Sequence, residues 1–364
     1  MLNDSLNIYK NKTVLVTGHT GFKGSWLCIW LLELGAKVVG LALDPKSDKD
    51  LFTSSKLSNK LKDYRGDIRD KSFIEKVLDA EKPEIVFHLA AQSLVLKSYD
   101  APINTYEVNV MGTAYLLQAI RNSISVKICV CITTDKVYKN NEWIWPYRET
   151  EALGGYDPYS ASKAAAEIVI DSYRNSFFNP TQYQKHQKAI ASVRAGNVIG
   201  GGDWSDNRII PDTIKALKSG TVIELRKPKA VRPWQHVVEP LGGYLLLGAK
   251  MLGNARAYCS AYNFGPESEN INTVQRLVEE LIALNGEGSW KNISDINDLH
   301  EATLLSLDIN KAKSDLGWNP VLSFKQTIQY TYDWYHNATT MDNYKLCVAQ
   351  INNYLAQWKL KNEK

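Results

Sequence analysis

Residues 12–24, KTVLVTGHTGFKG, decide the fold of this 364-residue chain. The segment opens with a short β-branched run, passes through Gly18, Gly21 and Gly24, and continues into apolar residues at helical spacing. A glycine turn between a strand and a helix allows a tight bend, close approach of the backbone to a pyrophosphate, and close packing of helix on strand. The first helical amides and the helix dipole attract the phosphates. The turn therefore predicts dinucleotide binding, although its spacing is GxxGxxG rather than GxGxxG.

The rest of the first half repeats the alternation of strand and helix. Near-continuous apolar strands separated by amphipathic helices indicate a parallel sheet that is covered on both faces. We therefore expect an α/β fold, a Rossmann-type doubly wound parallel sheet. The predicted strands are Lys12–Thr17, Lys37–Leu43, Ile85–Leu89, Val126–Ile132 and Ala189–Ala195, and the predicted helices are Gly21–Leu34, Ile103–Asn122 and Tyr159–Asn175.

The pattern changes after residue 195, where glycine and proline become frequent. Residues 1–195 are expected to form an NAD-binding Rossmann domain, and residues 196–336 mainly a smaller C-terminal substrate-binding lobe. Helices are predicted at Val237–Leu252 and Thr273–Asn285, and part of 230–252 can return to the Rossmann domain. Residues 337–364 form a polar, helix-compatible tail whose position the sequence does not predict.

Composition excludes several classes of protein. The chain is 44% hydrophobic and 23% charged, which is typical of globular proteins and not of disordered or fibrous ones. The apolar stretches are too short for a membrane span, and the first ten residues have no signal-peptide core, so we expect a cytoplasmic protein. A net charge of +4 is too small to predict nucleic-acid binding. The five cysteines include no CxxC pair, so we expect a reducing compartment and no metal site.

The end of the second predicted strand carries an acidic residue, Asp44, 26 residues after Gly18. An acid there hydrogen-bonds the adenosine ribose and repels a 2′-phosphate, which favours NAD over NADP. A helix cap or a solvated loop acid is the alternative. Asp67, after a probable third strand, can instead lie at the adenine edge.

A tyrosine and a lysine occur four residues apart in YSASK, at Tyr159 and Lys163. On a helix these two side chains share one face. Tyrosine is a poor base at neutral pH, and a neighbouring ammonium group is expected to lower its pKa. The lysine can also hold a nicotinamide ribose. A bare YxxxK is common by chance, but its place after the fifth predicted strand of a dinucleotide-binding pattern favours a catalytic pair.

Several motifs together resemble the extended short-chain dehydrogenase/reductases that act on nucleotide sugars. They are TGHTGFKG, HLAAQ, TTDKVY, YSASK, VRAGNVIGGGDW, VRPWQHV and LGWNP, and they span roughly residues 10–320. The spellings TGHTGFKGSWL, EWIWPYRE, GGYDPYS and RAGNVIGGGDW are most similar to the CDP-glucose 4,6-dehydratases of that family, which serve deoxysugar and O-antigen-type polysaccharide synthesis.

The resemblance implies NAD as cofactor and a net dehydration. NAD oxidises the glucose C4 hydroxyl while Tyr159 takes its proton, water leaves across C5 and C6, and hydride returns to C6, giving a 4-keto-6-deoxy sugar nucleotide. Thr134 is expected to bind O4 and Asp135 to protonate the leaving C6 hydroxyl. The implied cofactor residues are Gly18, Thr20, Gly21, Phe22, Gly24, Asp44, Asp67, Ile68, Ala90, Ala91, Gln92, Asn109, Thr133, Tyr159 and Lys163.

One residue departs from the better-known dTDP-glucose dehydratases, in which the triplet resembles Thr-Asp-Glu and the glutamate removes H5. Here the triplet is Thr134-Asp135-Lys136, which resembles the CDP-sugar branch. The group that takes H5 is left open, because Lys136 can do so only when it is neutral. A strand-end ion pair between Asp135 and Lys136 is the alternative.

The second half supplies candidates for binding a nucleotide diphosphate. Arginine suits bidentate phosphate contacts. By resemblance, Asn197 reaches the phosphate–sugar region, and Arg208 and Arg232 the diphosphate. Arg194, His88 and His236 are expected to be structural, most of the tryptophans to be packing residues, and His300 and Glu301 to face the nucleotide.

The sequence leaves other functions as alternatives to the dehydratase. A 4-epimerase or a dehydratase of another nucleotide sugar is the alternative within enzymes, but an epimerase needs no acid at C6. A redox-sensing NAD-binding protein would not need the intact Tyr159–Lys163 pair, and a nucleic-acid regulator would need a basic stripe. The helices at 103–122 and 159–175 carry apolar residues on more than one face, which favours a homodimer or homotetramer through a four-helix interface.

Overall fold

Seven strands form the central sheet of the computed structural model, which describes residues 5–268, 271–294 and 304–362. The strands are β1 (Thr13–Thr17), β2 (Lys37–Ala42), β3 (Lys62–Arg65), β4 (Ile85–His88), β5 (Ile128–Ile132), β6 (Ala189–Ala195) and β11 (Ala261–Phe264). Their order is β11-β6-β5-β4-β1-β2-β3, and every neighbouring pair is parallel. The order reverses at β1, so the crevice at the carboxyl ends of β1 and β4 is where such sheets bind ligands.

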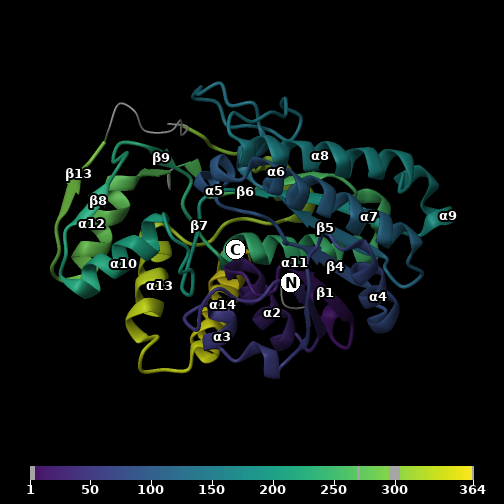
Figure 1. Ribbon diagram of the computed structural model, residues 1–364, viewed down its shortest axis with the longest axis horizontal. Helices are drawn as coiled ribbons and strands as arrows, with labels where there is room; N and C mark the ends of the chain where they lie inside the picture. The colour runs from purple at the N-terminus through teal and green to yellow at the C-terminus, as the bar shows by residue number, and fades with distance from the viewer. Residues whose placement is uncertain (1–4, 269–270, 295–303, 363–364) are drawn as a thin grey trace.

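Helices cover both faces of the sheet, as the doubly wound prediction requires (Figure 1). Val14 and Val16 of β1 point to one face, where they join a core with α2 (Phe22–Glu33), α11 (Val238–Gly253) and α14 (Asn343–Asn362). Leu15 points to the opposite face and packs with α4 (Lys71–Glu81), α7 (Gly112–Asn122) and α8 (Pro158–Ser176). The Rossmann-type fold class is thus confirmed.

The long helix expected at Ile103–Asn122 is a composite. It consists of α6 (Pro102–Tyr106), a π-helical turn, η3 (Glu107–Met111), and α7. Such π-turns insert a residue into a helix and are frequent at functional sites. Helix α11 begins at Val238, one residue after the predicted start, and it contains Pro240 because proline is tolerated in the first turn of a helix.

Residues after 195 contribute both to one end of the molecule and to the central sheet. Helices α10 (Ile209–Ser219) and α12 (Val274–Asn285) gather with the paired strands β8 (Ile223–Leu225) and β13 (Trp290–Asn292) at one end of the molecule (Figure 1). In contrast, α11 packs on β5 and β6, and the unpredicted strand β11 pairs with β6. The division into two lobes at residue 195 stays a prediction.

The remaining elements are short, apart from two C-terminal helices. Helix α14, in the tail that the sequence left unplaced, packs on α2, where Tyr344 donates to Glu33 at 2.7 Å. In the residues that the structure describes, no helix has the length and apolar character of a membrane span. The other elements are α3 (Leu51–Ser54), α5 (Val95–Asp100), η4 (Asp135–Val137), α9 (Tyr183–His186), β7 (Val198–Ile199), β9 (Val231–Arg232), β10 (Gln235–His236), β12 (Asn272–Thr273), the π-turn Ala312–Leu316 and α13 (Phe324–Asn337).

Candidate active site

The glycine turn joins β1 to α2 and leaves no room for side chains. Gly18 has a φ of +74°, and a Cβ there would lie 2.7 Å from the backbone nitrogen of Ala90. A Cβ at Gly24 would lie 2.1 Å from the carbonyl oxygen of Gly18, so helix and turn are in direct backbone contact. Gly21 is the N-cap of α2 and exposes the first amides of the helix. This geometry fits the pyrophosphate of a dinucleotide.

His19 links the glycine turn to neighbouring strands of the sheet, a role that the sequence did not reveal. Its buried ring lies against Gly40 of β2, where a Cβ would come within 2.3 Å of the ring. Its Nε2 pairs with Asp63 Oδ1 of β3 at 2.8 Å, and burial lowers its pKa. His19 therefore ties the turn to the second and third strands.

The predicted adenosine residues lie beyond the carboxyl ends of β2 and β3. Asp44 is 87% exposed and lies 3.8 Å from Arg65, so its carboxylate is accessible to a ribose. Asp67 accepts hydrogen bonds from Arg69, which hold the pKa of that carboxyl below its usual value. Ile68 is buried against Gly112 of α7. Their roles toward a cofactor stay predictions.

The loop after β4 is held by the π-turn. Asn109 accepts from the backbone nitrogen of Gln92 at 2.9 Å, donates to the Gln92 carbonyl at 3.0 Å, and donates to Ser162 of α8 at 2.8 Å. Asn109 therefore positions the segment containing Ala90 and Ala91. These contacts of Asn109 are all within the protein. The cofactor role that the resemblance implied for it stays a prediction.

The triplet Thr134-Asp135-Lys136 follows β5, with Thr134 as the N-cap of the turn η4 and Asp135 and Lys136 as its first two residues. Thr134 donates to Asp135 Oδ1 at 2.9 Å. Asp135 is 1% exposed, and its Oδ2 has no hydrogen-bond partner among the described residues. A Cβ at Gly196 would lie 1.8 Å from that Oδ2, so the glycine provides the room in which the carboxyl lies. A buried carboxylate oxygen without a partner is costly and marks a site that a ligand can complete.

Tyr159 and Lys163 lie on the first turns of α8. Asp157 caps the helix by accepting from the Ser160 amide at 2.9 Å, and the Tyr159 amide donates to Ser98 at 3.1 Å. The side chain of Thr134 lowers the pKa of Tyr159, so the tyrosine lies close to the triplet.

The pKa of this tyrosine differs from the expectation. Burial raises the pKa of Tyr159 to about 12, whereas a lowered value was predicted from Lys163. Burial also lowers the pKa of Lys163 to about 8, and its Nζ donates to the Ile132 carbonyl at 3.4 Å. The reason is that desolvation disfavours the charged form of both groups.

A buried ion pair that the sequence did not predict supports these residues. Glu167, one turn after Lys163, accepts from Arg194 at 2.9 and 3.0 Å and from Thr133 at 2.5 Å. Arg194 also donates to Tyr138 at 2.8 Å, two residues after the triplet. The structural role expected for Arg194 is confirmed. The hydroxyl of Thr133, a predicted cofactor residue, donates to Glu167 of this network.

The candidate substrate residues lie beyond β6. Arg208 pairs with Asp203 at 3.1 Å, and its charge lowers the pKa of Tyr159, so the guanidinium lies near this tyrosine. Asn197 has a left-handed φ of +46° in the loop after β6, and Arg232 is buried on β9. Their contacts with a nucleotide stay predictions.

Two histidines are structural, as expected, and a pair of cysteines is buried. His88 lies between Thr17 and Thr113 at 2.7 and 3.0 Å, and burial lowers its pKa to about 3. His236 is fully buried between Trp26 and Tyr330. Cys129 and Cys131 are buried in β5. His300 and Glu301 lie outside the described residues.

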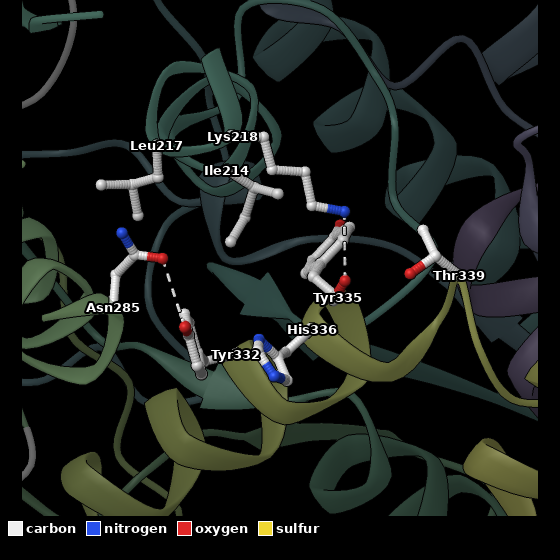
Figure 2. Close-up of a pocket in the computed structure, with 8 residues that line it drawn as sticks. All are labelled: Ile214, Leu217, Lys218, Asn285, Tyr332, Tyr335, His336 and Thr339. Atoms are coloured by element: carbon white, nitrogen blue, oxygen red, sulfur yellow. Dashed lines mark hydrogen bonds between the residues drawn. The ribbon is translucent and has the colours of Figure 1, made fainter. Parts of the chain in front are cut away.

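A cavity of about 380 Å³ lies between α10, α12 and α13 (Figure 2). Tyr332 donates to Asn285 at 3.2 Å across it, and Lys218 donates to the Tyr335 carbonyl at 3.2 Å. Its lining contains none of the predicted site residues.

A doubly wound parallel sheet, a glycine turn after its first strand and a Tyr–Lys pair on one helix define an extended short-chain dehydrogenase/reductase. Comparison with known sequences agrees. The chain belongs to the family described as GDP-mannose 4,6 dehydratase, which matches residues 15–331.

Individual relatives refine this placement. The chain is 44% identical to the CDP-glucose 4,6-dehydratase of Salmonella typhimurium, over 96% of this chain and 98% of the relative. The dTDP-glucose 4,6-dehydratase of Streptomyces venezuelae, solved with NAD bound, superposes with a TM-score of 0.74 at 26% identity, over 89% of this chain and 97% of that one. A UDP-glucose 4-epimerase of Thermotoga maritima shares the fold at 24% identity and a TM-score of 0.74, covering 90% and 100%.

Proposed function

We propose that this protein is a lyase that converts CDP-glucose to CDP-4-keto-6-deoxyglucose and water, with NAD as a cofactor that ends each turnover unchanged. The observation that carries the proposal is that Tyr159 lies close to Thr134 and Asp135 at the carboxyl end of β5. The 44% identity to a CDP-glucose 4,6-dehydratase over nearly the whole chain supports the choice of nucleotide.

The residues present fit NAD. Neither Gly18 nor Gly24 has room for a Cβ, so the turn packs backbone against backbone, which is the geometry that suits a pyrophosphate at the start of α2. Asp44 would hold the adenosine ribose, and Lys163 the nicotinamide ribose. When bound, NAD supplies the hydride acceptor for C4 and the hydride donor for C6. Binding of NAD and NADP, measured by calorimetry, tests this assignment, and equal affinities would contradict the role of Asp44.

In this proposal, side chains of the protein carry out the proton transfers. Tyr159 takes the proton of the C4 hydroxyl, for which its high pKa has to fall, and Lys163 and Arg208 are the cations that can stabilise the tyrosinate. Thr134 orients O4. Ketone formation makes H5 acidic, so that a base can remove it and the C6 hydroxyl can leave.

Asp135 faces the leaving group in this proposal. Its buried Oδ2 lacks a partner, which suits an acid that meets a substrate hydroxyl. Lys136, half-buried on the same turn, is the candidate base for H5. An epimerase would have no use for an acid at C6, so this carboxyl favours the dehydratase.

Two measurements test the function. The first incubates the protein with CDP-, UDP-, GDP- and dTDP-glucose and follows the 4-keto product; a preference for another nucleotide would overturn the choice of substrate. The second uses Asp135→Asn, which keeps the size of the side chain but cannot give a proton. We expect NADH and a 4-keto-glucose nucleotide to accumulate while 6-deoxy product forms slowly. Equal loss of NADH formation and product would contradict the acid role.

We also propose a homodimer or homotetramer. Ile103 of α6 is 70% exposed and Ile168 of α8 is 60% exposed, and the two helices are in contact. Exposed isoleucines on neighbouring helices support a helical interface with a second copy. Light scattering should give a dimer or larger, and Ile168→Glu should weaken it. A monomer at micromolar concentration would refute this proposal.

A cytoplasmic location is the remaining part of the proposal. All five cysteines are free thiols, four of them buried, which supports a reducing compartment. Fractionation of cells with an antibody to the native protein tests it.

A further inference from the structure

Gln235 is a buried polar residue of β10 whose side chain reaches the carboxyl ends of two strands of the central sheet. The residue is 2% exposed. Its Nε2 donates to the carbonyl of Gly196, which follows β6, at 3.1 Å, and to the carbonyl of Phe264, the last residue of β11, at 3.0 Å. In the sequence, Gln235 belongs to the motif VRPWQHV and has no assigned role.

The orientation of this carboxamide follows from its partners. Both are carbonyl oxygens, which only accept hydrogen bonds, so the NH₂ group and not the oxygen has to face them. The backbone nitrogen of Gln235 also donates to the carbonyl of Asn197 at 3.3 Å. Gln235 therefore holds two successive carbonyls, those of Gly196 and Asn197, and joins them to the end of β11.

Gly196 is the residue that lies against the carboxyl of Asp135. A Cβ on Gly196 would come within 1.8 Å of Oδ2 and 2.7 Å of Oδ1, so its α-carbon is already in contact with that carboxyl. Asp135 is 1% exposed, and Thr134 donates to its Oδ1 at 2.9 Å. A shift of the Gly196 backbone toward this buried carboxyl would therefore displace it.

We propose that Gln235 is a positioning residue for the elimination step, which fixes the Gly196 backbone against Asp135 and so keeps this carboxyl aligned with the C6 hydroxyl. The inference rests on the proposed function, in which Asp135 is the acid that protonates the leaving hydroxyl. Gln235 gives and takes no proton itself. It acts through Gly196 and Asp135.

Oxidation at C4 depends on a different support. Tyr159 lies on α8, where its amide donates to Ser98 and where Asp157 caps the helix. Neither of these hydrogen bonds involves β10 or the loop after β6. Loss of the hydrogen bonds of Gln235 should therefore slow elimination more than oxidation.

Gln235→Met tests this role, because methionine is unbranched like glutamine but has no N–H donor. We expect formation of 6-deoxy product in single turnovers to fall by about 10-fold, the effect of a displacement of half an ångström where 1 Å costs about 10²-fold. NADH should accumulate. Affinities for NAD and CDP, measured by calorimetry, should stay at the wild-type values, because the backbone contact with Asn197 is kept.

Gln350 of α14 offers a matched control. It is also a buried glutamine, its Nε2 donates to a backbone carbonyl, that of Tyr330, and its Oε1, like that of Gln235, has no partner among the described residues. Both substitutions by methionine should lower the melting temperature, because each removes a buried hydrogen bond. Gln350→Met should leave the ratio of NADH to 6-deoxy product unchanged.

Combination with Asp135→Asn shows whether Gln235 acts through Asp135. Asparagine cannot give a proton, so elimination in that variant no longer depends on the alignment of the carboxyl. Residues that act through one another are not additive. Adding Gln235→Met to Asp135→Asn should slow elimination by less than about 2-fold, whereas a residue that only supports the fold would have the same effect in both backgrounds.

A milder variant keeps the test informative if Gln235→Met folds poorly. Gln235→Asn keeps the NH₂ donors on a side chain that is one methylene shorter. Its elimination rate should lie between those of the wild type and Gln235→Met. Elimination at the wild-type rate in both variants would show that the two hydrogen bonds of Gln235 do not position Asp135.

Three other results would overturn the inference. They are an equal loss of oxidation and elimination in Gln235→Met, an undiminished effect of this substitution in the Asp135→Asn background, and a selective loss of CDP affinity, which would make Gln235 a support of the nucleotide site. Failure of the proposed function is distinguishable, because wild-type protein would then form no NADH and no 4-keto product with CDP-glucose, and the inference would fall with it.

Discussion

Gly196→Ala tests how closely the position of Asp135 controls the reaction. A Cβ at Gly196 would lie 1.8 Å from Oδ2, 2.2 Å from Cγ and 2.7 Å from Oδ1 of Asp135. Real Cβ atoms do not come closer than 3.0 Å to other heavy atoms, so the carboxyl has to move by at least 1.2 Å. A misplacement of about 1 Å can cost about 10²-fold in rate. We therefore expect turnover of CDP-glucose to fall by about 10²-fold.

The assay follows 4-keto-6-deoxy product and NADH together. Since Gly196 has no left-handed φ, alanine adds no backbone strain, and the overpacking should cost about 1–3 kcal/mol of unfolding free energy. NAD affinity should not change. Gly253→Ala is the control, because a Cβ at Gly253 would meet no atom within 4 Å. A Gly196→Ala variant with wild-type turnover would show that Asp135 is not the group that limits the reaction.

Three other substitutions probe separate parts of the site. Tyr159→Phe should lower turnover by about 10²–10⁴-fold with little change in substrate affinity, and near-normal turnover would exclude Tyr159 as the base. Glu167→Gln breaks the buried pair with Arg194 and should lower the unfolding free energy by about 3–5 kcal/mol in urea titrations; a loss below 1 kcal/mol would mean that the pair is dispensable. The pKa of Lys163 is lowered to about 8 in the folded protein, so the unfolded chain binds more protons between pH 8 and its ordinary value of 10.5, and wild-type stability gains from rising pH there. Lys163→Met should lack this gain, which amounts to about 3 kcal/mol, and parallel pH profiles of stability would contradict it.

Strands buried on both faces were the most predictable part of the fold. β1 (TVLVT) and β6 (AIASVRA) are mostly apolar runs in the sequence, because a parallel sheet covered by helices leaves no polar face. β11 escaped prediction because it has only four residues, AYNF, and one of them, Asn263, is polar. That side chain accepts from Tyr138 at 2.7 Å and donates to the carbonyls of Tyr147 and Asp308. These partners are far away in the sequence, so no local pattern could indicate that the asparagine is buried.

The site was predictable where chemistry depends on spacing and not where it depends on burial. The four-residue spacing placed Tyr159 and Lys163 on one helix, α8. The direction of the tyrosine pKa could not be read from that spacing, since it depends on desolvation by the surrounding fold.

Strand β11 belongs to the central sheet but comes more than 60 residues after β6 in the sequence, so the cofactor-binding half cannot simply be cut after β6. All seven residues of β6 are buried, and β6 lies between β5 and β11 only when residues 261–264 are present. A fragment cut near residue 195 would display the amides and carbonyls of β6 as an unpaired apolar edge, which promotes aggregation. We expect such a fragment to be recovered from inclusion bodies. Anyone who wishes to graft this dinucleotide-binding half into a fusion protein should therefore retain the chain through Phe264.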